Sequence, residues 1–226
     1  MSAVVYADFT CPASYLASLR MDELLAQGRA VPDWRAVEHR PRLPLTGMQL
    51  EPTARATRDE ALTEVLALSP PRAGLPRRAP GLLPHTGAAV VAYAEAYGAG
   101  VADLVRPLLF ATYWVDGEDI GDPEVLRRLL PGAFAKGRRT SDAIRDFGYA
   151  VTSQRGPVTT AAYRRIRDWQ QEWLGLGADV GLTLVTDSAT LSGSVVLEHL
   201  GEPQPGARPA PVTSRPQAGS SVPAGH

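Results

Sequence analysis

Cysteine occurs once among the 226 residues, at position 11, and Pro12 follows it directly. Proline is favoured at the first position of a helix, because its missing N–H would have no partner there. We therefore expect Cys11 at or just before a helix N-terminus, where unpaired backbone N–H groups and the helix dipole stabilise a thiolate. Such surroundings lower the pKa of a thiol below about 8.5. The sequence predicts an acidic, nucleophilic Cys11, and the alternative is an inert cysteine in a strand-to-helix turn.

A single thiol limits the chemistry that this segment can perform. It cannot form an intramolecular disulfide, but its attack on a disulfide gives a mixed disulfide that an external thiol can resolve. Two polar neighbours each have two interpretations. Ser14, one helical turn after Cys11, either donates a hydrogen bond to the thiolate or caps the helix. Asp8, three residues before Cys11, either relays a proton or only shapes the turn.

A metal site is not expected. One cysteine and four scattered histidines do not give the spacing of a zinc site. These histidines are His39, His85, His199 and His226.

The first elements that must position Cys11 are predicted around it. Residues 3–7 form a β-branched and aromatic run that predicts a buried strand. Apolar residues then recur at near-helical spacing from Pro12 to Gly28, and residues 34–40 resemble a second strand. The segment therefore reads as strand, tight turn, helix and strand.

A mostly helical block follows. It begins at about Thr57, is interrupted by a loop over residues 69–84, and resumes with a helix from Thr86, which can cap it, to Gly98. Apolar spacing continues over residues 101–111, where Pro107 must kink the helix or restart it. Two more helices are expected over residues 123–130 and 140–151.

The last part of the chain predicts a return to mixed structure. Thr159 or Thr160 can cap a long helix with one apolar face, and residues 182–186 and 190–192 then predict a hairpin. A short helix over residues 195–200 ends the ordered part. The apolar face of the long helix consists of Ala162, Ile166, Trp169, Trp173 and Leu176.

Two segments carry a resemblance to a known family. The run Asp8-Phe9-Thr10-Cys11-Pro12-Ala13-Ser14-Tyr15-Leu16 resembles the active-site opening of the DsbA-like family, and residues 94–122, with Leu109-Phe110-Ala111-Thr112-Tyr113-Trp114, resemble the insertion of its FrnE-type branch. The resemblance covers roughly residues 3 to 200. It implies an α/β, thioredoxin-like fold with a large α-helical insertion.

The resemblance also implies a division of the chain. Residues 1–56 and 156–202 are expected to form the two parts of a thioredoxin-like domain, and residues 57–155 the helical insertion domain. Residues 203–226 are rich in Pro, Gly and Ser, with almost nothing to bury, so we expect a disordered tail.

The sequence departs from the family pattern at two positions. Ser14 replaces the second cysteine, which gives Cys-Pro-Ala-Ser, and Leu182 replaces the cis-proline that precedes Thr183. A non-proline cis bond costs roughly 2.5–4 kcal/mol, so a trans bond is expected there. The resemblance implies catalytic roles for Cys11 and Ser14. It implies contacts with substrate or thiol for Asp8, Pro12, Leu182 and Thr183.

Three functions are compatible with these residues. The first is a DsbA-family oxidoreductase that works as a monothiol protein through Cys11, with glutathione or mycothiol as an external co-substrate and no tightly bound cofactor. The second is a transferase or isomerase that depends on such a thiol, similar to kappa glutathione transferases and 2-hydroxychromene-2-carboxylate isomerases. The third is a non-catalytic thioredoxin-fold binding protein.

Composition narrows the partners. Hydrophobic residues make up 44% and charged residues 21% of the chain, as in ordinary globular proteins, and the net charge of −1 gives no attraction to nucleic acid or an anionic membrane. The sequence begins without a signal-peptide pattern and has no apolar run of about 20 residues, so we expect a cytoplasmic protein. The expected partner is a small thiol or a protein disulfide, and a homodimer is left open.

Overall fold

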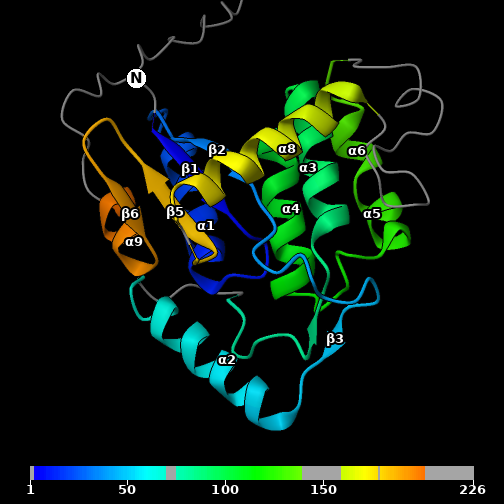
Figure 1. Ribbon diagram of the computed structural model, residues 1–226, viewed down its shortest axis with the longest axis vertical. Helices are drawn as coiled ribbons and strands as arrows, with labels where there is room; N and C mark the ends of the chain where they lie inside the picture. The colour runs from blue at the N-terminus through cyan, green and yellow to red at the C-terminus, as the bar shows by residue number, and fades with distance from the viewer. Residues whose placement is uncertain (1–2, 70–74, 139–158, 178, 202–226) are drawn as a thin grey trace, which may run out of the picture.

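The computed structural model describes residues 3–69, 75–138, 159–177 and 179–201. The predicted helix over residues 140–151 and the predicted tail from residue 203 lie outside these ranges. The elements, labelled as in Figure 1, are β1 (Val4–Ala7), α1 (Pro12–Ala26), β2 (Asp33–Ala36), β3 (Met48–Gln49), α2 (Pro52–Leu66), β4 (Leu82–Leu83), α3 (Gly87–Ala99), α4 (Ala102–Trp114), α5 (Pro123–Leu129), α6 (Pro131–Phe134), α8 (Thr160–Gly175), β5 (Leu182–Val185), β6 (Thr190–Ser192) and α9 (Ser194–Gly201).

A four-stranded sheet with the order β2-β1-β5-β6 forms the centre of the protein. β1 pairs with β2 in parallel and with β5 in antiparallel fashion, and the β5–β6 pair is the predicted hairpin. In this register Tyr6 of β1 lies opposite Thr183 of β5, and Ala7 lies opposite Leu182. The end of β1, which leads to Cys11, is therefore next to the start of β5.

Helices cover the sheet and extend beyond it. α8 crosses the front of the sheet in Figure 1 and packs on α3 and β2, whereas α1 contacts α9, α4 and α2. α3 is rich in Ala and Val and is buried along most of its length, as expected for a helix with neighbours on several sides. α2 extends along the lower edge of the molecule in Figure 1, and Leu62 is its one buried residue.

An aromatic cluster joins the sheet to the helical block. The ring of Phe9, at the end of β1, lies 5.1 Å from that of Phe110 and 6.1 Å from that of Tyr93. Tyr15 of α1 stacks on Trp114 of α4 at 5.7 Å. These side chains are buried, and aromatic pairs of this kind contribute roughly 0.5–1.5 kcal/mol beyond their area. The turn that carries Cys11 is thus supported on its inner side by a packed core.

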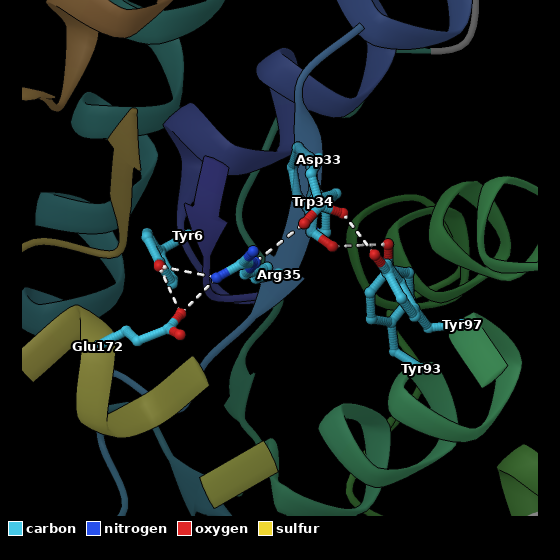
Figure 2. Close-up of polar contacts among 7 residues, drawn as sticks. All are labelled: Tyr6, Asp33, Trp34, Arg35, Tyr93, Tyr97 and Glu172. Carbon is cyan, nitrogen blue, oxygen red and sulfur yellow. Dashed lines mark hydrogen bonds and ion pairs between the residues drawn. The ribbon is translucent and has the colours of Figure 1, made fainter. Parts of the chain in front are cut away.

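Polar contacts attach α8 and α3 to the sheet, as Figure 2 shows. The Tyr6 hydroxyl donates to Glu172 of α8 at 2.8 Å, and Arg35 of β2 pairs with both Glu172 and Asp33. Tyr97 of α3 donates to Asp33 at 2.9 Å. Burial, helped by the hydrogen bond to Glu172, raises the pKa of Tyr6 to about 12. Tyr6 therefore remains a neutral donor at physiological pH.

Most of the predicted elements that fall on described residues are confirmed, with shifted bounds. The predicted strand over residues 34–40 ends earlier, at Ala36, and the helix expected from about Thr57 begins at Pro52. Residues 82–83, expected in a loop, form β4 and pair with β3. Thr159 caps α8 by accepting from the Ala162 N–H at 3.1 Å.

Two details of the helical predictions differ from the structure. Thr86 lies at the N-cap of α3 but makes no side-chain cap there, because its hydroxyl donates to Asp8 at 3.2 Å. Leu176, assigned to the apolar face of the long helix, is 38% exposed, although Trp169 and Trp173 of that face are buried. α4 continues through Pro107 as one helix.

Candidate active site around Cys11

Cys11 occupies the N-cap of α1, as predicted. Its backbone is extended, with φ −84° and ψ 125°, and Pro12 is the first helical residue. The Cys11 N–H donates to the Asp8 carbonyl at 3.2 Å, and the Cys11 carbonyl accepts from the Tyr15 N–H at 3.1 Å. The residue as a whole is half-buried.

Gly181 lies directly against the Cys11 side chain. A Cβ at Gly181 would meet the Cβ of Cys11 at 2.7 Å and its Sγ at 3.3 Å. Contacts as short as 2.7 Å are essentially absent from real structures, so a glycine is the residue that fits without displacement. Gly181 precedes β5, and its carbonyl accepts from the Asp8 N–H at 2.8 Å.

Ser14 binds to the same glycine. Its hydroxyl donates to the Gly181 carbonyl at 2.6 Å, and the side chain is fully buried. Since a hydroxyl has a single proton, Ser14 must release this carbonyl before it can donate to the sulfur of Cys11. In this structure Ser14 therefore connects α1 to the start of β5.

The surroundings of Cys11 raise the pKa of its thiol above the ordinary value. Burial is the largest cause, and the Asp8 carboxylate adds to it. The backbone N–H groups of Ser14 and Ala13 lower the pKa, as would the Ser14 hydroxyl once it turned from Gly181 to the sulfur, but these groups do not outweigh the two effects that raise it. The prediction of an unusually acidic Cys11 is thus wrong in sign, although its place at the helix N-terminus is confirmed.

Asp8 is the most highly connected polar residue near Cys11. Its carboxylate is buried and accepts from the N–H and hydroxyl of Thr10 at 2.7 and 2.6 Å. It also accepts from the His39 N–H at 2.9 Å and the Thr86 hydroxyl at 3.2 Å. These bonds join the turn before Cys11 to the end of β2 and the start of α3, so the turn-shaping role expected for Asp8 is present.

A second acidic group, which sequence reasoning missed, lies close to Asp8. The Glu38 carboxylate is mostly buried, and its oxygen lies 3.7 Å from Nδ1 of His85. Burial raises the pKa of the Glu38 carboxyl, His85 lowers it, and Asp8 raises it. Glu38 and Asp8 therefore form an acidic pair whose positions come from different elements, a juxtaposition that spacing along the chain does not reveal.

Arg58 of α2 is the other residue that sequence reasoning missed. Its Nη2 donates to the Thr10 carbonyl at 3.0 Å and to the Tyr113 hydroxyl at 3.1 Å. Its guanidinium carbon lies 5.8 Å from the centre of the Trp114 ring. The Thr10 carbonyl belongs to the peptide bond that leads into Cys11, so a positively charged side chain of α2 binds the turn that carries the thiol.

Leu182 and Thr183, for which the resemblance implies contacts with substrate or thiol, are buried within the protein. Leu182 is fully buried, and its carbonyl accepts from the Gly193 N–H at 3.0 Å. Thr183 is also buried, with its hydroxyl 3.5 Å from that of Ser192. Every peptide bond in the described ranges is trans, as expected for the bond before Leu182. Gly181, the residue before Leu182, lies directly against Cys11.

Two findings concern metal sites and membrane-spanning helices. Within the described ranges, no three His, Cys, Asp or Glu side chains are grouped as a metal site requires. No helix among these residues is long and apolar enough to cross a membrane.

Comparison with known proteins finds similar solved structures. No protein-family model matches the sequence, and no curated protein matches it. The structure is similar to a probable DsbA oxidoreductase from Streptomyces coelicolor, with a TM-score of 0.63 and 19% identity over 88% of each chain. It is similar to a 2-hydroxychromene-2-carboxylate isomerase, with a TM-score of 0.61 and 18% identity over 88% of this chain and 92% of the other.

A third similar structure is the cytosolic disulfide reductase DsbM from Pseudomonas aeruginosa, solved with GSH. Its TM-score is 0.53, with 16% identity over 90% of this chain and 94% of DsbM. At sequence identities this low, structural similarity supports a shared fold and does not establish a shared function. Together with the sheet order and the cysteine at the N-cap of α1, these likenesses show that the chain has the DsbA-like thioredoxin fold.

Proposed function

We propose that this protein is a thiol-disulfide oxidoreductase that works with one cysteine, Cys11, and an external low-molecular-weight thiol. The observation that carries the proposal is the half-buried Cys11 at the N-cap of α1, packed against Gly181. The fold likeness to DsbA-like oxidoreductases supports it. Assignment to the FrnE-type branch is part of the proposal and rests on the resemblance of residues 94–122.

The reaction consists of two exchanges. The Cys11 thiolate attacks one sulfur of a disulfide, a new S–S bond forms, and the other sulfur leaves as a thiolate that takes up a proton. An external thiolate then attacks the substrate-derived sulfur of the mixed disulfide and releases Cys11. Over the two steps one disulfide is exchanged for another, with no net oxidation of the protein. With glutathione in excess, a second exchange in solution completes reduction of the substrate.

The environment of Cys11 sets the pH at which this attack is efficient. The raised pKa keeps Cys11 mostly as a thiol at neutral pH, so only a fraction of the protein carries the nucleophile. A thiolate of high pKa is more nucleophilic once formed. When charge develops on the sulfur, the Ser14 hydroxyl can turn from Gly181 and donate to it. The rate of exchange is therefore expected to rise with pH.

A second candidate is a thiol-dependent transferase or isomerase. Its support is the fold likeness to a 2-hydroxychromene-2-carboxylate isomerase and the raised pKa of Cys11, because a neutral thiol can donate a hydrogen bond to a bound thiolate. In that case Cys11 or Ser14 orients the bound thiol and forms no covalent bond. A non-catalytic binding protein is the outcome if neither activity is found.

The proposal includes the partners of Cys11. The substrate is a small or protein disulfide and the co-substrate a free thiol such as glutathione, consistent with the GSH solved with DsbM. We propose a cytoplasmic protein without a tightly bound cofactor, to which cytosolic DsbM lends support.

The test is turnover of an uncharged disulfide, 2-hydroxyethyl disulfide, with glutathione and a glutathione reductase system that reports oxidised glutathione. We expect activity above the uncatalysed exchange that is lost in Cys11→Ser. Activity that persists in Cys11→Ser overturns the monothiol mechanism. If turnover is absent while the protein binds S-methylglutathione in both forms, the second candidate is favoured.

A further inference from the structure

We propose that Cys11 reacts preferentially with a disulfide or thiol that carries a carboxylate, and that Arg58 of α2, assisted by Arg40, binds that carboxylate. This inference rests on the proposed function and names the chemical class of its substrate. It gives α2 a role in selecting negatively charged reactants for Cys11.

The first observation is that the Arg58 guanidinium has no acidic partner. It is half-buried and its Nε is buried without a hydrogen-bond partner. Its Nη2 donates to neutral oxygens, the Thr10 carbonyl and the Tyr113 hydroxyl. In the described part of the chain Arg58 takes part in no ion pair. Partly buried charges are usually compensated, so this guanidinium retains the capacity to bind an anion.

The second observation is that another positive charge acts on the same place. Burial raises the pKa of Tyr113 to about 12, while Arg58 and Arg40 lower it and Asp8 raises it. Arg40 follows β2, is exposed, and also has no ion pair within the described ranges. Two arginines from separate elements therefore direct positive charge at the Tyr113 hydroxyl.

The negative charge of Asp8 opposes these arginines at Tyr113, but it is buried. Asp8 is buried, and both oxygens of its carboxylate are occupied by donors from Thr10, His39 and Thr86. Glu38 is mostly buried, and burial raises the pKa of its carboxyl whereas His85 lowers it. The accessible charge beside the turn is thus positive.

The position of Arg58 suits a substrate that also reaches Cys11. Its nitrogen bonds to the carbonyl of Thr10, the residue bonded to Cys11, and Cys11 as a whole is half-buried. Nη2 of Arg58 already donates to two oxygens and its Nε is buried, so Nη1, which takes part in no hydrogen bond among the described residues, is the nitrogen that can donate to a carboxylate. A carboxylate held by Arg58 therefore brings a disulfide of the same molecule close to the thiol. Carboxylate-bearing thiols such as glutathione gain this contact, and uncharged ones react without it.

The experiment compares two disulfides that differ in charge. Rapid mixing and intact-mass measurement give the rate at which Cys11 forms a mixed disulfide with oxidised glutathione and with uncharged 2-hydroxyethyl disulfide. We expect Arg58→Gln to slow the glutathione reaction by about tenfold, the size of one charged hydrogen bond, and to change the uncharged reaction less than about twofold. Added salt is expected to slow the glutathione reaction selectively.

Matched variants distinguish recognition of the carboxylate by Arg58 from a purely structural role of this residue. Arg55→Gln removes an arginine one turn earlier on α2, whose guanidinium lies against Gly81, and is expected to leave both rates unchanged. Arg58→Lys retains the positive charge but not the planar guanidinium, and it should keep part of the preference for oxidised glutathione. If Arg58→Gln unfolds the protein, exposed Arg40→Gln is expected to lower the glutathione rate alone, by about threefold.

The outcomes also separate this inference from the proposed function. Equal slowing of both disulfides in Arg58→Gln overturns the inference, because Arg58 then only supports the turn. Calorimetry with S-methylglutathione, which cannot exchange, gives a second measure. If wild-type protein reacts with neither disulfide but binds S-methylglutathione in an Arg58-dependent manner, the carboxylate site stands and the oxidoreductase proposal fails. No reaction and no binding overturns both.

Discussion

Gly181 and Cys11 touch so closely that a single added methyl group at Gly181 would lie 2.7 Å from the Cβ of Cys11. The two residues come from opposite ends of the chain and meet where β1 and β5 lie side by side. The contact encloses part of the thiol and thereby contributes to the burial that raises its pKa. The reactivity of Cys11 is therefore a property of the strand pairing as well as of its own helix.

Gly181→Ala tests this contact. The new Cβ requires α1 or the start of β5 to shift, so we expect the free energy of unfolding to fall by about 1–3 kcal/mol in urea denaturation. Gly175→Ala near the end of α8 is the control, because a Cβ at Gly175 would meet nothing within 4 Å. That variant should keep or slightly increase stability, by up to about 1 kcal/mol. Equal stability of the two variants would contradict the close contact.

Asp8→Asn changes both stability and the thiol. Asparagine has one acceptor oxygen and would turn an NH2 group toward donors, so we expect a loss of about 2–3 kcal/mol in unfolding free energy. Because the Asp8 charge raises the pKa of Cys11, the variant should also react with iodoacetamide at lower pH. Asp168→Asn, at an exposed pair with Arg167, should shift neither. A Cys11 pKa that stays constant in Asp8→Asn argues against this coupling.

The raised pKa of Cys11 also makes stability depend on pH. Above the unfolded pKa of about 8.5, the folded protein holds a proton that the unfolded chain releases. The resulting stabilisation is complete below about pH 8.5 and is lost as pH rises through the folded pKa. Between pH 7 and about pH 9.5 we expect the unfolding free energy of wild-type protein to fall by more than that of Cys11→Ala. Parallel losses in the two proteins would show an unperturbed thiol.

Ser14→Cys restores the second cysteine at the third position of α1. We expect an intramolecular disulfide with Cys11, seen as a loss of two mass units and of both free thiols, and insulin reduction of the dithiol type. The reduced variant should be about 1 kcal/mol less stable, since the bond to the Gly181 carbonyl is lost. Ser18→Cys, one turn further along α1 and also buried, is too far to pair and is the control. Insulin reduction by both variants would rule out a specific dithiol site.

Local rules are sufficient to predict much of the fold. The preference of proline for the first helical position locates the N-cap at Cys11, Thr159 caps α8, and the change of period after Gly177 marks the β5–β6 hairpin. β3 and β4 are missed because each has only two residues in a proline-rich stretch, and neither shows a period.

The electrostatics of the site could not be predicted in this way. The helix N-terminus favours a thiolate, but burial and Asp8 come from residues that only the fold brings together, and they outweigh it. Arg58 gives no signal either, because it lies on an exposed helix and its partner is a backbone carbonyl, which has no sequence signature. The family resemblance directs attention to Leu182, whereas the residue found against Cys11 is its neighbour Gly181.

Intact-mass measurement after exposure to 2-hydroxyethyl disulfide tests the central claim most directly. We expect wild-type protein to gain one adduct of about 76 mass units on Cys11, at a rate that rises with pH, and to lose it when glutathione is added. Cys11→Ser should gain none. A wild-type protein that remains unmodified even at about pH 9, while still folded, would contradict the proposal that Cys11 exchanges disulfides.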